Sequence, residues 1–231
     1  MNYNELSYQQ DADVRVSRVL KGVYLNMTLG LLITALTAWF CQPPSLFSSF
    51  IAANSWRIWA LIIAEFAIVI GVSAGINKLS TPVAMLLFFV FAVINGMMLS
   101  PILLAYTKTS IVKTFIITAT VFGAMSIYGL FTNRDLTRMG NILFMALIGL
   151  IIASLINIFT RSTTLEWIIS GVGVLIFVGL TAWDTQQIKR MSLMMPEAGT
   201  GRLAVLGALS LYLDFINLFL YLLRFFGNSR D

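Results

Sequence analysis

Three acidic side chains lie inside long apolar runs of this sequence, where a negative charge is expensive. Asp214 interrupts ALSLYLDFINLFLYLLRFFG, Asp184 interrupts GLTAWDTQQIK, and Glu65 lies in a third apolar run. Each unpaired ionised carboxylate at the centre of a membrane helix costs roughly 2.5–3.5 kcal/mol. Three would cost about 8–10 kcal/mol, which is comparable to the stability of an ordinary domain. We therefore expect these groups to face a helix bundle interior, where they are paired, protonated or hydrated.

The spacing of neighbouring residues places two of these acids on polar helical stripes. Residues three or four positions apart share one face of a helix. One stripe consists of Gly207, Ser210, Asp214, Asn217 and Tyr221, and the other of Gly173, Phe177, Thr181, Asp184 and Gln187. On consecutive antiparallel helices, these stripes would bring the two aspartates side by side. Two carboxyl groups within hydrogen-bonding reach share a proton, because both cannot ionise cheaply.

The polar residues on these stripes have a simpler explanation as interhelical hydrogen-bonding groups. We expect this structural role for Ser210, Asn217 and Thr181, since side-chain amides and hydroxyls commonly join membrane helices. The aspartates point instead to function, because an amide would join the helices without the ionisation penalty. For Glu65 both interpretations stay open, because it lies about a third of the way along its helix and could simply hold a hydroxyl or backbone group.

The composition is that of a polytopic membrane protein. Hydrophobic residues make up 58% of the 231 residues and charged residues 11%, against roughly 25% charged residues in soluble domains. Seven segments are long enough to span a bilayer. They are 23–41, 57–76, 82–106, 111–131, 139–160, 165–188 and 203–226. Six or eight helices remain alternatives, because Pro101 interrupts the third segment.

The tail and the short loops predict the orientation. Residues 1–22 are polar and lack the features of a cleaved signal peptide, so we expect a cytoplasmic tail at 1–22 and one transmembrane domain at 23–231. Lys and Arg are more frequent in the loops that share a side with this tail, which favours a cytoplasmic N-terminus. Proline and turn residues separate the spans, as at Pro43-Pro44-Ser45.

Other residue types exclude several classes of function. The chain has no histidine, which removes Ser-His and Cys-His nucleophile pairs, HExxH zinc sites and histidine-ligated haem. The lone Cys41 cannot form an internal disulfide. The net charge of +5 comes with no basic patch interleaved with aromatic residues, so we expect no nucleic-acid partner. The last span has no lysine for a retinal Schiff base.

Three stretches together resemble the Bax-inhibitor family of membrane proteins. They are VYLNMTLGLLITALTAW, GLTAWDTQQIK and ALSLYLDFINLFLYLLRFFG, and the resemblance extends over nearly the whole chain. It implies an all-α bundle of seven transmembrane helices with a central C-terminal helix. The short tails and loops resemble those of a bacterial inner-membrane member.

The resemblance also implies a function and its residues. Family members act as pH-sensitive calcium leak channels or carriers, which assigns the proton sensor to Asp184 and Asp214 and a supporting place in the ion path to Glu65. Some members carry an arginine latch at the inner end of the second helix. This chain has Asn77 and Lys78 there, and lysine lacks the bidentate fork of arginine, so Lys78 is the candidate latch.

We therefore expect a non-enzymatic calcium leak without a bound cofactor. Asp184 and Asp214 would act as transient calcium ligands, and the expected partners are membrane lipid and the calcium ion; the sequence identifies no protein partner. One alternative is a proton-coupled transporter of another solute, and another is a regulatory membrane protein without flux. An aspartyl intramembrane protease is a weaker alternative, because Trp183 and Leu213 precede the aspartates where those enzymes carry Tyr-Asp and Gly-x-Gly-Asp motifs.

Overall fold

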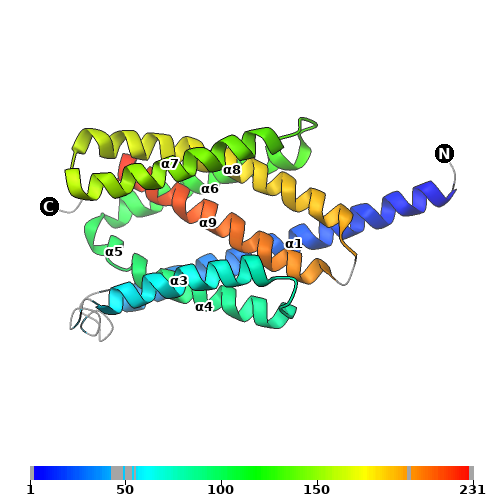
Figure 1. Ribbon diagram of the computed structural model, residues 1–231, viewed down its shortest axis with the longest axis horizontal. Helices are drawn as coiled ribbons and strands as arrows, with labels where there is room; N and C mark the ends of the chain where they lie inside the picture. The colour runs from blue at the N-terminus through cyan, green and yellow to red at the C-terminus, as the bar shows by residue number, and fades with distance from the viewer. Residues whose placement is uncertain (1–2, 43–48, 50–53, 55, 197–198, 229–231) are drawn as a thin grey trace. The chain divides into compact units, whose positions relative to one another are not determined.

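The long elements of this protein are all helices. The computed structural model describes residues 3–42, 49, 54, 56–196 and 199–228 (Figure 1). Its helices are α1 (Tyr3–Cys41), α3 (Trp56–Gly75), α4 (Thr81–Leu99), α5 (Ile102–Ala105), α6 (Lys108–Phe131), α7 (Thr137–Thr160), α8 (Thr163–Met194) and α9 (Thr200–Phe226). The predicted turn at Pro43-Pro44-Ser45 lies outside the described residues.

Seven helical segments in the described part of the chain are long and apolar enough to cross a membrane. Each contains or overlaps one predicted segment, so the all-α, seven-span fold is confirmed. The third span, Thr81–Ala105, consists of α4 and α5. Pro101 separates them, because proline lacks an N–H and its ring clashes with the preceding helical turn.

The first helix begins much earlier than predicted. Residues 3–22, expected to form a polar tail, are helical and continue directly into the first span. No Gly or Pro interrupts residues 3–21, so the local sequence permits a helix despite its polarity. Val19, Val23 and Met27 are buried at four-residue spacing, so the packed face also extends beyond the predicted start of the apolar segment.

The contacts divide the chain into two compact units. Unit 1 comprises residues 1–105 and 188–212, and unit 2 comprises residues 106–187 and 213–231. Helices α8 and α9 therefore each contribute residues to both units. In unit 1, α4 packs against α1 and α3. Gly96 of α4 permits a close approach, because an added Cβ would lie 2.6 Å from the backbone oxygen of Thr34.

Unit 2 is built from α6, α7 and parts of α8 and α9. An added Cβ at Gly129 of α6 would collide with the Ala182 carbonyl of α8. Phe122 of α6 and Phe215 of α9 meet edge to face, with ring centroids 5.4 Å apart. These contacts enclose the parts of α8 and α9 that carry the two aspartates.

The C-terminal helix is the most buried of the seven spans. In α9 67% of the most apolar stretch is buried, against 6% in α3 and α7. Many large apolar side chains of α3 and α7 are exposed, including Phe66 and Phe144. The exposed faces suit lipid, and the burial of α9 agrees with the expected central helix.

Candidate functional site

Within unit 2, α8 and α9 approach closely on the faces that carry the two aspartates. An added Cβ at Gly173 of α8 would lie 2.8 Å from the ring of Tyr221. One turn further along α8, Phe177 stacks on the same ring, with centroids 5.9 Å apart and an interplanar angle of 24°. The parts of both polar stripes that belong to unit 2 therefore lie at this helix contact, with Asp184 and Asp214 among them.

The carboxyl groups of Asp184 and Asp214 lie within hydrogen-bonding reach of each other. A carboxylate only accepts hydrogen bonds, so a hydrogen bond between the two groups requires a proton on one of them. Asp214 is only 4% exposed, and its Oδ2 has no hydrogen-bond partner among the described residues. This arrangement would allow the pair to share one proton, and it leaves one buried oxygen of Asp214 without a partner among the described residues.

Another polar side chain in unit 2 also has a buried, unsatisfied atom. Ser126 of α6 is buried, and its Oγ has no partner among the described residues. It shares a helix face with Phe122, which contacts α9, and with Gly129, which contacts α8. Ser126 is thus a candidate addition to the site that sequence reasoning missed.

Two of the expected interhelical hydrogen-bonding groups act within their own helices. Thr181 Oγ1 donates to the Phe177 carbonyl at 2.7 Å, and Asn217 Nδ2 donates to the Leu213 carbonyl at 2.8 Å. A helix carbonyl one turn back is the nearest acceptor for such short side chains, so the role expected of these two residues between helices stays a prediction. Ser210 is half-buried in the part of α9 that belongs to unit 1.

Glu65 belongs to unit 1, where it ends a chain of hydrogen bonds. Asn95 Nδ2 donates to Glu65 Oε1 at 3.1 Å, and the Tyr212 hydroxyl donates to Asn95 Oδ1 at 3.0 Å. Thr34 Oγ1 lies 2.6 Å from the same hydroxyl and donates to the Ala92 carbonyl at 2.9 Å. The chain joins α3, α4, α9 and α1 through one buried tyrosine.

Comparison with known proteins identifies the family. The sequence model of the family described as "Inhibitor of apoptosis-promoting Bax1" matches residues 16–231. The chain belongs to this Bax-inhibitor family. It is 49% identical over 211 residues, 90% of each chain, to "Inner membrane protein YbhL" of Escherichia coli strain K12. It is also similar to proteins described as uncharacterized from Borreliella burgdorferi (43% identity over 98% of this chain and 99% of the relative) and Rickettsia prowazekii (44% identity, 95% and 93%).

The candidate latch of this Bax-inhibitor protein, Lys78, is exposed in the turn after α3. Lys78 lies in unit 1 and Asp184 in unit 2, so the latch stays a prediction. A different basic residue ties this turn within unit 1. Arg202 of α9 donates from Nη1 to the Asn77 carbonyl at 2.8 Å.

The residues that sequence reasoning missed carry recognisable signals. On α6, Ser110, Thr114, Thr118 and Ser126 are buried hydroxyls whose spacings are all multiples of four residues. This period marks one helix face, although no acid drew attention to it. Thr34, Asn95 and Tyr212 are isolated polar residues on three separate helices, and only the folded structure brings them together.

Proposed function

We propose that this Bax-inhibitor protein is a pH-sensitive calcium leak channel or carrier, controlled by the proton that Asp184 and Asp214 share. The observation that carries the proposal is the close approach of their carboxyl groups, together with the unpartnered Oδ2 of Asp214. The family resemblance supports the same two residues. The name of the Escherichia coli relative supports an inner-membrane location, and the loop charges support a cytoplasmic N-terminus.

The number of protons on the Asp184–Asp214 pair sets its net charge and so its attraction for a cation. With one proton present, the hydrogen bond holds α8 against α9 within unit 2. Loss of that proton leaves two carboxylates in contact, which repel each other and attract a cation. A further proton in acid makes the pair neutral and removes the attraction for calcium. Low pH should therefore favour the closed state, and higher pH should favour passage.

The oxygen ligands at this pair suit weak, transient binding of calcium rather than tight binding. Calcium takes six to eight oxygen ligands, with carboxylates supplying the charge. The described residues contain no cluster of three or more acidic, cysteine or histidine side chains that could hold a metal. Two carboxylates, aided by water and hydroxyls such as that of Ser126, would bind weakly enough for release, which a leak requires.

Calcium flux into proteoliposomes tests the proposal. We expect wild-type flux to rise with pH, and we expect Asp184→Asn and Asp214→Asn to lower the flux and flatten its pH dependence. Asp135→Asn is the matched control, because Asp135 is an exposed acid of the same unit and an amide can still accept from Thr137. An unchanged pH profile in both pair variants would refute the assignment.

The shared proton also fits a second function, proton-coupled transport of another solute. A protonatable carboxyl pair inside a membrane is suited to carrying protons as well as sensing them. Transport driven by an imposed proton gradient, in the absence of a calcium gradient, would favour this alternative. A leak would follow the calcium gradient alone.

A further inference from the structure

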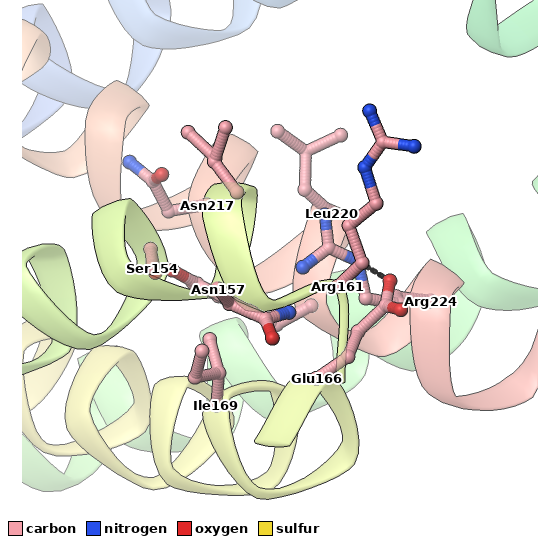
Figure 2. Close-up of a pocket in the computed structure, with 10 residues that line it drawn as sticks. Ser154, Asn157, Arg161, Glu166, Ile169, Asn217, Leu220 and Arg224 are labelled. Atoms are coloured by element: carbon pink, nitrogen blue, oxygen red, sulfur yellow. Dashed lines mark ion pairs between the residues drawn. The ribbon is translucent and has the colours of Figure 1, made fainter. Parts of the chain in front are cut away.

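A cavity of about 540 Å³ with charged and amide groups in its lining lies within unit 2, where α7 ends, α8 begins and α9 approaches its C-terminus (Figure 2). It is lined by Arg161, Glu166 and Arg224, and by the amides of Asn157 and Asn217. This volume is in the range of small-molecule sites, roughly 300–1,000 Å³. The apolar spans end at these positions, so the cavity lies at the level of a membrane surface.

The charges lining the cavity favour an anion. Two arginines and one glutamate line the cavity, which leaves one net positive charge. Arg224 Nε lies 3.5 Å from Glu166 Oε1, and this single contact uses one of the five N–H donors of the guanidinium. Figure 2 shows the Arg161 side chain extending away from that ion pair. Arg161 therefore contributes a charge that Glu166 does not neutralise.

The backbone at Arg161 is held in an unusual conformation. Arg161 ends α7 with a φ of 47°, and among the described residues no other non-glycine has a positive φ. Glycine is the usual residue at such a helix end, and a side chain there costs roughly 1–2 kcal/mol. Strained residues of this kind concentrate at functional sites. This turn has an arginine at the cavity, although glycine would adopt the positive φ at a lower free-energy cost.

The neutral groups add further donors. Asn157 Oδ1 already accepts from the Ser162 amide at 3.0 Å and the Thr160 hydroxyl at 3.3 Å. The N–H groups of its side chain are therefore the part available to a ligand. The Tyr221 hydroxyl is engaged with Ser154. Donors thus exceed free acceptors, which is the arrangement that binds oxyanions.

We propose that this cavity binds a phosphate oxyanion, supplied either by a lipid headgroup or by free phosphate. Two arginines disfavour a metal cation, and the charged side chains in the lining disfavour a wholly apolar ligand. Guanidinium groups match phosphate oxygens in a planar, bidentate geometry. The site is separate from the proposed calcium path in its chemistry, and its test does not depend on calcium flux.

Calorimetric titration of the full-length protein in detergent with inorganic phosphate tests the first source, with chloride at equal ionic strength as the blank. We expect Arg161→Gln to weaken binding about tenfold or more, because a charge-assisted hydrogen-bonding group is lost. Lys113→Gln is the matched control, since Lys113 is an exposed cation on α6 of the same unit. It should leave the affinity within about twofold, as expected for a screened surface charge.

Native mass spectrometry with added phosphatidylglycerol or diacylglycerol tests the second source. We expect wild type and Lys113→Gln to retain phosphatidylglycerol and Arg161→Gln to release it, whereas diacylglycerol, which lacks phosphate, should not be retained. Retention of the lipid alone assigns the headgroup, and calorimetric binding alone assigns free phosphate. If Arg161→Gln matches wild type in both measurements, or if Lys113→Gln loses as much binding, the proposal is overturned. Arg161 is exposed and forms no ion pair with described residues, so this variant should fold.

Discussion

The Tyr212 hydroxyl connects a buried hydrogen-bonded group of unit 1. Tyr212 is fully buried, its ring meets Phe88 and Phe91 edge to face, and its hydroxyl contacts both Thr34 and Asn95. Removing one member of a buried network leaves the others unsatisfied, which costs more than the net value of the bond that is lost. The hydroxyl oxygen of Tyr212 therefore links α9 to α1 and α4 directly, and to α3 through Asn95.

Tyr212→Phe should destabilise the protein by about 1–3 kcal/mol, because Asn95 Oδ1 loses its donor while the ring packing is retained. Chemical unfolding in detergent measures the change. Tyr128→Phe is the control, since Tyr128 is exposed on α6 and its substitution should shift stability by less than about 0.5 kcal/mol. Equal effects of the two substitutions would contradict the network.

Two substitutions distinguish a structural role of Glu65 from a functional one. Glu65→Gln keeps an oxygen that accepts from Asn95, so stability should stay within about 1 kcal/mol, while Glu65→Leu should lose about 1–3 kcal/mol. If Glu65 supports the ion path as predicted, Glu65→Gln also lowers calcium flux in proteoliposomes. Unchanged flux with retained stability would leave Glu65 a structural residue only.

At the scale of helices, unit 2 depends on small residues where α6 and α8 touch. Gly129 faces the Ala182 backbone so closely that the space of a single methyl group is already occupied. Backbone is less able to move aside than a flexible side chain. The position of Ala182, two residues before Asp184, therefore makes this contact a determinant of where the aspartate lies.

Gly129→Ala should destabilise the protein by roughly 1–3 kcal/mol, because the added methyl overpacks a rigid contact. Gly123→Ala is the matched control on the same helix, since an added Cβ there has no neighbour within 4 Å. Alanine favours helix over glycine by up to about 1 kcal/mol, so the control should be neutral or slightly stabilising. Thermal unfolding of both variants provides the comparison.

Elements were predictable where one sequence property dominates. The seven spans follow from apolar length, and the break between α4 and α5 follows from Pro101. The start of α1 was not predictable from hydropathy, because its first residues are polar yet helical. At the site, the spacing around Asp184 and Asp214 indicated that they could meet. The partners of Glu65 could not be predicted, because Asn95 and Tyr212 reach it only through tertiary packing.

At the scale of the whole molecule, α1 is longer than a bilayer is thick. Its 39 residues measure roughly 58 Å at 1.5 Å per residue, while the hydrocarbon core is about 30 Å thick. Part of this helix must therefore leave the hydrocarbon. The polar composition of residues 3–18 identifies the N-terminal end as the part that does so.

The predicted orientation can be tested with single cysteines, because Cys41 is the only cysteine in the chain. In a Cys41→Ser background, Lys78→Cys should react with a membrane-impermeant maleimide only after the cells are opened. Lys108→Cys should react in spheroplasts, since an odd number of spans separates it from Lys78. Both native lysines are exposed, so access is not limited by packing. The opposite labelling pattern would reverse the orientation.

In the row of hydrogen bonds from Glu65 to the Ala92 carbonyl, the direction of donation depends on whether the Glu65 carboxyl carries a proton. While Glu65 is ionised, Asn95 donates to it and Tyr212 donates to Asn95, so the one hydrogen of Thr34 has two competing acceptors, Tyr212 and Ala92. A neutral Glu65 would donate to an inverted Asn95 amide, and each later group would then donate onward to the Ala92 carbonyl. Each hydrogen that links two of these groups would then have its own acceptor, so acid should strengthen this cluster while it reverses the order of donors and acceptors.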